Sequence, residues 1–261
     1  LLQKGEQVRA LVLPGEDTSP INGLPVEKVE GNVLDRTALD RAMEGAHTVF
    51  HLAAVISIMP GRNEWMWQVN VGGTKNVLAA ARKAGVQRLV YTSSIHALKR
   101  IPEGQTVDEA LPFDPDNPAG AYDSTKAAAS LAVMEAARDG LNAVVVCPTG
   151  VVGPYDYRRS EFGDLVLNWM KRGAGVMVDG YYDFVDVRDV AHGHIQAAEK
   201  GHSGQAYILG GERVSLEWMF AVVRSVMGLP IRVIKIPLEL ARFVASFMPF
   251  YYKTMRTRPK F

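Results

Sequence analysis

The stretch VQRLVYTSS at residues 86–94 decides the fold class of this chain. A short apolar run that ends in small hydroxyl residues is typical of a buried parallel strand, and open α/β sheets place their ligand crevice at the carboxyl ends of such strands. A second apolar run, Ala143 to Pro148, predicts another buried strand, and Tyr122 to Arg138 predicts a helix between them that ends near Gly140. This order of strand, helix and strand indicates a parallel sheet covered by helices.

The same alternation continues on both sides of this stretch, which makes the fold class α/β. Asp35 and Ser215 are suitable helix N-caps, and Gly85 is a suitable helix end. The segment between Ser94 and Tyr122 is polar and rich in proline, and a connection that long predicts a functional loop. Further strands are expected at Val8–Leu13, Val26–Val29, Thr48–Ala54, Gln205–Leu209 and Ile231–Ile236, and further helices at Arg36–Met43, Asn63–Ala84, Arg188–Lys200 and Ser215–Met227.

The most informative side chains are a tyrosine and a lysine four residues apart. In AYDSTK at residues 121–126, Tyr122 and Lys126 share one helix face. A tyrosine hydroxyl has an unperturbed pKa near ~10, and we expect the neighbouring ammonium to lower it towards working pH. Ser94, at the end of the neighbouring strand, can bind the same substrate oxygen. This pair is common by chance, but after the 86–94 strand it predicts a site that transfers a proton between a carbonyl and an alcohol.

Composition excludes several other classes of function. The formal net charge is +1, which gives no argument for a nucleic-acid partner. No apolar run approaches the ~20 residues that span a bilayer, and the aromatic and basic segment Pro249–Phe261 is expected to be solvated or packed rather than membrane-bound. Cys147 is the single cysteine, so a reducing, cytoplasmic location and a buried thiol are expected. His192 and His194 do not share a helix face, so no metal site is predicted.

Two domains are expected. Residues 1–152 predict a dinucleotide-binding domain of the Rossmann type, and residues 153–261 a smaller substrate-binding lobe, with 184–210 returning to the first sheet. Such a domain begins with a strand and a glycine-rich turn that meets the pyrophosphate. The chain instead opens with LLQKGEQ, which is typical of a helix end leading into the Val8 strand, and Gly72-Gly73 lies inside a helical segment. We therefore expect the first strand and its loop to precede Leu1.

Six short motifs occur in the order of one known family. They are His51-Leu52-Ala53-Ala54, Asn70-Val71-Gly72-Gly73-Thr74, Thr92-Ser93-Ser94, Tyr122 to Lys126, Pro148 to Pro154, and Phe184 to Val190. Each motif is weak alone, but together they cover essentially the whole chain. The chain resembles the extended short-chain dehydrogenase/reductase family, and within it the dihydroflavonol-reductase-like members.

The resemblance implies a catalytic set and a mechanism. Ser94 matches the catalytic serine, Tyr122 the acid/base, and Lys126 a partner that also holds the nicotinamide ribose. Asn70 matches an asparagine that organises the proton relay. Ser94, Tyr122 and the nearby His96 are the residues expected to face the substrate. The implied mechanism is hydride transfer between the nicotinamide and a substrate carbon, with the proton passing through Tyr122.

The resemblance also implies a cofactor site for NAD or NADP. Asn32 and Val33 take the adenine side, where the family more often has aspartate. Leu13 ends the second strand of such a domain, where NADP-dependent reductases often have arginine, so NAD is slightly favoured. The expected cofactor-binding residues are Leu13, Asn32, Val33, Leu52, Ala53, Ala54, Asn70, Thr92, Ser93, Tyr122, Lys126, Pro148, Thr149, Gly150 and Val151.

Three functions remain open from the sequence. The first is an NAD(P)-dependent oxidoreductase that acts on a small, hydrophobic carbonyl or alcohol. The second is a nucleotide-sugar epimerase or dehydratase, but such enzymes commonly have arginine where Tyr182 precedes Asp183, and a phenol cannot replace a guanidinium. The third is a non-catalytic cofactor sensor, which usually lacks the Ser/Tyr/Lys set. An apolar group that packs in the core or lines a substrate pocket is formed by Met59, Trp65, Met66 and Trp67. A homodimer, if formed, is expected to pair the Tyr122 helix with the Asn63 helix.

Overall fold

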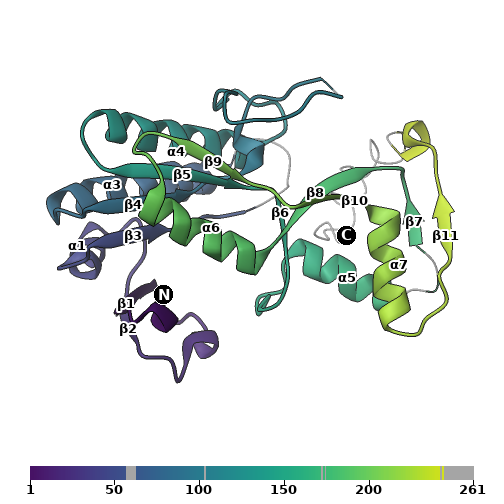
Figure 1. Ribbon diagram of the computed structural model, residues 1–261, viewed down its shortest axis with the longest axis horizontal. Helices are drawn as coiled ribbons and strands as arrows, with labels where there is room; N and C mark the ends of the chain where they lie inside the picture. The colour runs from purple at the N-terminus through teal and green to yellow at the C-terminus, as the bar shows by residue number, and fades with distance from the viewer. Residues whose placement is uncertain (57–62, 103, 172, 174, 242, 244–261) are drawn as a thin grey trace. The chain divides into compact units, whose positions relative to one another are not determined.

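The first of two compact units contains a parallel sheet of four strands. The computed structural model describes residues 1–56, 63–102, 104–171, 173, 175–241 and 243. The first unit consists of Leu1–Thr149 and Arg188–Gly210, and the second of Gly150–Val187 and the chain from Gly211 onwards. The strands of the sheet are β3 (Thr48–His51), β4 (Arg88–Thr92), β5 (Ala143–Pro148) and β9 (Ala206–Leu209), in the order β3-β4-β5-β9 (Figure 1). The predicted α/β class with a parallel sheet is confirmed.

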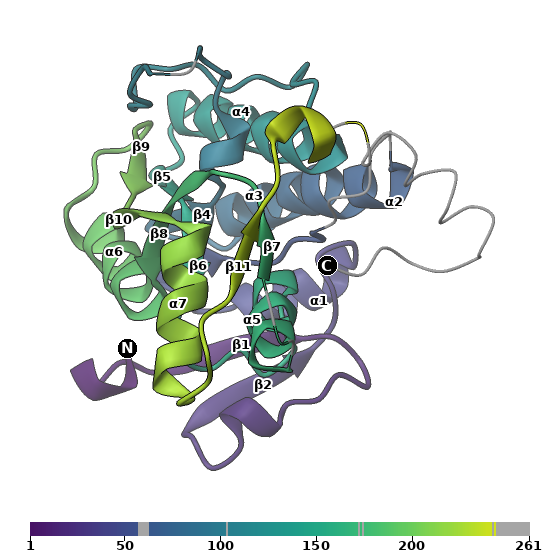
Figure 2. The same ribbon diagram turned by 90° about the vertical axis from the view of Figure 1, so that its right-hand side faces the viewer.

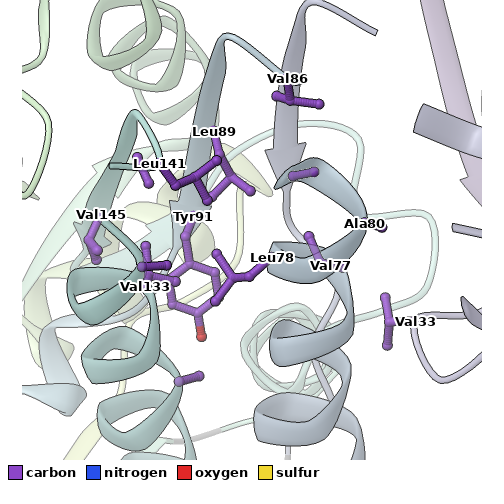
Figure 3. Close-up of a cluster of buried hydrophobic side chains, with 14 of the residues drawn as sticks. Val33, Val77, Leu78, Ala80, Val86, Leu89, Tyr91, Val133, Leu141 and Val145 are labelled. Atoms are coloured by element: carbon purple, nitrogen blue, oxygen red, sulfur yellow. The ribbon is translucent and has the colours of Figure 1, made fainter. Parts of the chain in front are cut away.

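Helices cover both faces of this sheet. Leu89, Tyr91 and Val145 point to one face, where they pack with residues of α3 (Thr74–Lys83) and α4 (Ala121–Arg138), as Figure 3 shows. Val90, Val144 and Val146 point to the other face and pack with Ala197 of α6 (Val187–Lys200). Because side chains alternate along a strand, a slip of one residue would turn both apolar sets to the wrong face, and this fixes the register.

The expected helix over residues 63–84 is helical throughout but changes its winding. It consists of α2 (Glu64–Trp67), a π-helical segment (Gln68–Gly73) and α3. The Asn63 side chain caps its start by accepting a hydrogen bond from the Met66 N–H at 3.0 Å. A side chain at Gly73 would meet Val33 at 2.5 Å, so the close approach of Val33 requires glycine there.

The strands β1 (Val8–Val12) and β2 (Val26–Glu30) form a separate parallel pair in the first unit. The helix α1 (Arg36–Met43) follows them, and Asp35 caps it by accepting from the Ala38 N–H at 3.0 Å, as predicted. Among the described residues, no strand pairs with both β1 and β3. The strand and glycine-rich loop expected before Leu1 remain a prediction.

The second unit contains shorter elements, many of which the sequence did not reveal. Among the described residues its sheets have the orders β10-β8-β6 and β11-β7. The helices α5 and α7 lie beside each other (Figure 2), and Trp169 of α5 packs against Phe220 of α7. Ser215 caps α7, as expected. The bounds are β6 (Gly150–Val152), α5 (Glu161–Lys171), β7 (Gly175–Met177), β8 (Tyr181–Asp186), β10 (Glu212–Ser215), α7 (Leu216–Val226) and β11 (Val233–Lys235).

Several expected bounds need correction. The strand expected at Thr48–Ala54 ends at His51, the one at Ile231–Ile236 is limited to Val233–Lys235, and β6, α5, β7, β8 and β10 were not expected as elements. Phe184 pairs with Gly150 and Glu212 in the second unit, so the chain returns to the first unit at Arg188 rather than at Phe184. Strands of three to six residues with mixed exposure carry little periodicity, which explains why the four strands were missed, whereas α5 was missed despite its 11 residues.

Candidate active site

Ser94 and Tyr122 bring two hydroxyl groups together just beyond the end of β4. Ser94 follows β4 by two residues and caps the short 3₁₀ helix Ile95–Ala97, where its Oγ accepts a hydrogen bond from the His96 N–H at 3.2 Å. Tyr122 is the second residue of α4, and its hydroxyl is hydrogen-bonded to the Ser94 side chain. The Ser94 hydroxyl accepts from a backbone amide, so its own proton remains available for donation.

The environment of Tyr122 differs from the one the sequence predicted. Burial raises the pKa of the Tyr122 hydroxyl, the hydrogen bond with Ser94 lowers it, and the neighbouring Asp123 carboxylate raises it further. The expectation that the Lys126 charge brings this pKa down to working pH is therefore wrong. The four-residue spacing is correct, but desolvation of the phenolate dominates. Tyr122 is thus held in its protonated, acidic form.

Lys126 is buried and holds its ammonium against the backbone at the end of β4. Its side chain is 3% exposed, and Nζ donates a hydrogen bond to the Thr92 carbonyl oxygen at 2.7 Å. The ammonium also lies 5.2 Å from the centre of the Tyr91 ring. Burial lowers the pKa of Lys126 to about 8, because the charged form loses hydration. The charge therefore sits at the carboxyl end of β4, and its expected contact with the nicotinamide ribose stays a prediction.

Asn70 lies in the π-helical segment and is fully buried. Its side-chain amide binds both backbone groups of Val55 and the hydroxyl of Thr125. Asn70 is therefore connected to the loop after β3 and to the helix of Tyr122. Its expected part in a proton relay stays a prediction.

His194 supports this region through contacts that the sequence analysis did not predict. Its Nδ1 lies 2.8 Å from the Val190 carbonyl oxygen, and its Nε2 lies 2.6 Å from Thr92 Oγ1. A carbonyl only accepts, so Nδ1 carries the proton and Nε2 accepts from the Thr92 hydroxyl. His194 thereby supports the residue whose carbonyl binds Lys126. Nothing local in the sequence indicates this contact, because the two residues lie 102 positions apart.

Several residues expected to bind the cofactor follow the carboxyl ends of strands in the first unit. Leu13 follows β1, and Leu52 and Ala53 follow β3; Leu13 is 48% exposed and Leu52 61% exposed. Their expected contacts with the cofactor stay predictions. Pro148 ends β5, and the Thr149 N–H beyond it donates to the Leu209 carbonyl oxygen.

Other expected cofactor residues are engaged within the protein. Val33 is buried beside Gly73, and the Asn32 carboxamide oxygen accepts from the Leu34 N–H at 2.7 Å. The Ser93 hydroxyl is buried 2.6 Å from that of Ser130. Gly150 and Val151 belong to the second unit. The roles of these residues stay predictions.

A carboxylate near the end of β1 was also missed. Glu16 follows the Pro14-Gly15 turn and accepts a hydrogen bond from the Leu13 N–H at 3.3 Å. It therefore places a negative charge beside Leu13. The sequence signal was available, because Glu16 follows the strand whose end was expected to meet the cofactor.

The remaining candidate residues are more scattered than the sequence suggested. The His96 side chain is exposed, with Nδ1 3.9 Å from an Asp123 carboxylate oxygen, and its substrate contact stays a prediction. Of the expected apolar group, Met66 is buried, Trp65 is exposed, and Met59 lies outside the described residues. Cys147 is buried, as predicted.

Within the described part of the chain, no three potential ligands among histidine, cysteine, aspartate and glutamate are grouped to hold a metal ion. In the same part, no helix combines the length and the apolar character needed to cross a membrane.

The described geometry can be compared with known proteins. The model of the NAD dependent epimerase/dehydratase family matches residues 1–210. The chain belongs to this family. Family members bind NAD or NADP, and the protein is an NAD(P)-dependent oxidoreductase of the extended short-chain type.

Three relatives illustrate the similarity. The "Putative dihydroflavonol 4-reductase" of Synechocystis sp. is 36% identical over 244 residues, which cover 92% of this chain and 71% of the relative. The "Sterol demethylase protein B" of Methylococcus capsulatus is 34% identical over 245 residues, which cover 94% of this chain and 74% of the relative. The crystal structure of gox2253 superposes with a TM-score of 0.86 at 32% identity, and covers 99% of this chain and 79% of that one.

Proposed function

We propose that this oxidoreductase interconverts a carbonyl and an alcohol on a small hydrophobic substrate, with Tyr122 as the acid/base. The hydrogen-bonded Ser94–Tyr122 pair beside the buried Lys126 carries the proposal. The bound nicotinamide supplies or accepts the hydride. In the reducing direction the hydride goes to the carbonyl carbon, the Tyr122 proton goes to the carbonyl oxygen, and solvent returns a proton to the phenolate.

The side chains have distinct tasks in this mechanism. Ser94 donates its free hydroxyl proton to the substrate oxygen and polarises the carbonyl. Tyr122 keeps its proton until the oxygen becomes basic, because burial raises its pKa. The Lys126 ammonium would, with Leu52, Ala53 and Pro148, hold the cofactor.

The cofactor is proposed to be NAD rather than NADP. The Glu16 carboxylate next to the Leu13 amide can accept hydrogen bonds from ribose hydroxyls, whereas it would repel a 2′-phosphate. Arg9 lies within β1 and binds Glu27, so its guanidinium is already engaged. Comparing the affinities for NADH and NADPH tests this choice, and a clear preference for NADPH would refute it.

A hydrophobic substrate is favoured over a sugar nucleotide. Tyr181 and Tyr182 are exposed on β8, and a phenol at Tyr182 cannot bind a diphosphate as a guanidinium does. Two relatives are named for a dihydroflavonol and a sterol, which are ring compounds without a phosphate group. Calorimetric titration with UDP-glucose separates the alternatives, because micromolar binding would move the proposal to sugar-nucleotide chemistry.

A homodimer is proposed through the surface of α3 and α4 in the first unit. A groove of about 370 Å³ lies there between Trp67, Val71 and Lys75 on one side and Leu131 and Glu135 on the other. Its lining combines apolar and charged side chains, as protein interfaces do. Sedimentation of the wild type and of Leu131→Arg tests this, and a wild type that stays monomeric would refute it.

The central test of the function is Tyr122→Phe. The ring still packs, but no proton can be donated, so reduction of hydrophobic ketones should fall by on the order of a thousandfold while cofactor binding persists. Tyr207→Phe is the matched control, because Tyr207 lies on β9 and its hydroxyl accepts a hydrogen bond from the His202 N–H. A Tyr122→Phe enzyme that retains most of its kcat would refute the assignment.

A further inference from the structure

The side-chain amide of Asn70 joins two segments that lie far apart in the sequence. Its Oδ1 accepts from the Val55 N–H at 2.7 Å, and its Nδ2 donates to the Val55 carbonyl oxygen at 2.9 Å and to Thr125 Oγ1 at 3.1 Å. Both amide protons and the amide oxygen are thus used. A flipped amide would place its protons against the Val55 N–H, so the orientation is fixed.

The chain of hydrogen bonds continues at Thr125, whose side chain is fully buried. A threonine hydroxyl has a single proton, and Thr125 donates it to the Tyr122 carbonyl oxygen at 3.0 Å. Thr125 Oγ1 therefore accepts from Asn70 rather than donating to it. The chain of bonds runs from Val55 through Asn70 and Thr125 to the backbone of the proposed acid/base.

Val55 needs such a partner because β3 ends at His51 and no strand includes residues 52–56. The Asn70 amide binds the N–H and the C=O of Val55 at once, as an adjacent strand would do. The backbone of Asn70 is held as well, because the Thr74 hydroxyl donates to its carbonyl oxygen at 2.6 Å. Asn70 lies in a π-helical turn, and such turns are frequent at functional sites.

We propose that Thr125 is a positioning residue that clamps the loop after β3 to the first turn of α4. The clamp fixes residues 52–56, which contain the proposed cofactor contacts Leu52 and Ala53, relative to Tyr122. Its effect on catalysis rests on the proposed function, but the clamp itself rests only on hydrogen bonds within the protein. Removing the hydroxyl leaves a buried Asn70 donor unpaired, which loosens both segments.

Thr125→Val and Thr125→Ser form the decisive pair of variants. Valine has the shape of threonine without the hydroxyl, and serine keeps the hydroxyl without the methyl group. In the cofactor-free protein, amide exchange in residues 52–56 should become about tenfold faster in Thr125→Val and remain near wild type in Thr125→Ser. The cofactor dissociation constant and kcat should each worsen in Thr125→Val by on the order of tenfold, because a misplacement of about 1 Å can already cost about a hundredfold in rate.

Ser124→Ala is the matched control, because Ser124 is a neighbouring hydroxyl on α4 that donates to the Asn117 carbonyl oxygen instead. It should leave exchange in residues 52–56 unchanged. If Thr125→Val does not fold, Thr125→Ala removes the same hydroxyl with less bulk and takes its place.

Two results would overturn the clamp: wild-type exchange in Thr125→Val, or equal damage in Thr125→Ser, since the methyl group would then be responsible. The two proposals can fail separately. If the wild type reduces no ketone, the proposed function is refuted, and faster amide exchange in Thr125→Val would still support the clamp.

Discussion

The end of β4 and the core of the second unit hold their side chains by different interactions. Around β4, Lys126, His194 and Asn70 are buried, and each binds named partners through hydrogen bonds. In the second unit, Trp169 and Phe220 pack edge to face in an apolar core, while the tyrosines of β8 stay exposed. Hydrogen bonds in a buried network fix direction as well as distance, whereas apolar contacts tolerate changes of shape. Substitutions in the first region should therefore affect chemistry, and those in the second should affect substrate preference.

The largest difference is expected between two lysines. Lys126→Met removes the buried ammonium, so cofactor affinity and kcat should both fall, with kcat/KM lower by on the order of a hundredfold or more. Lys235→Met is the control, because Lys235 is exposed and its ion pairs with Asp179 and Glu217 contribute little. Steady-state kinetics and cofactor titration measure both variants.

The pH profile sharpens the same comparison. Because the pKa of Lys126 is lowered to about 8, its charge is lost as pH rises through that value, and reduction should decline over the same range. Lys126→Met should lack this decline. Equal behaviour of the Lys126 and Lys235 variants would contradict the division between the two regions.

A smaller effect is expected on stability in acid. Burial and, to a lesser extent, the nearby Lys126 charge together lower the pKa of His51 to about 3, whereas the unfolded value is about 6.5. Between these values the unfolded chain binds a proton that the folded protein excludes. The free energy of unfolding is therefore unaffected by the titration of His51 above about pH 6.5. As pH falls from there towards about 3, the free energy of unfolding decreases by up to ~1.4 kcal/mol per pH unit.

Urea unfolding at several pH values measures this slope. His51→Gln should flatten it, because glutamine does not titrate. The substitution is a matched one, since glutamine can still donate to Thr74 Oγ1, which lies 2.9 Å from His51 Nε2. His47→Gln, at an exposed histidine, should leave the slope as it is. An unchanged slope in His51→Gln would show that the buried network of the first unit does not govern acid stability.

The smallest effect is expected in the second unit. Tyr182 is exposed, and its ring lies 6.1 Å from that of Phe184. Tyr182→Ala should raise KM for a hydrophobic ketone by roughly fivefold, the equivalent of about 1 kcal/mol of aromatic contact, with cofactor affinity unchanged. Tyr182→Phe should keep the wild-type KM. A Tyr182→Ala variant with weaker cofactor binding would contradict the assignment of this residue to substrate preference.

Much of the first unit was predictable because its signals are local. The strand at residues 86–94 and the spacing of Tyr122 and Lys126 located the serine, tyrosine and lysine of the candidate site, and the Asp35 cap was correctly placed. The second unit was less predictable. Tyr181–Asp186 is a strand whose first two residues are exposed, so it lacks the apolar alternation on which the prediction of strands depends.

The sequence by itself determined the order of the elements, the family motifs and the residue types of the site, because helical spacing and strand ends are properties of short segments. Only the tertiary structure decided that burial raises the pKa of Tyr122, that Lys126 binds the Thr92 carbonyl, and that Thr125 links Asn70 to α4. Desolvation and hydrogen-bond partners depend on which distant segments pack together. That packing is set by the whole chain, so no local pattern could reveal it.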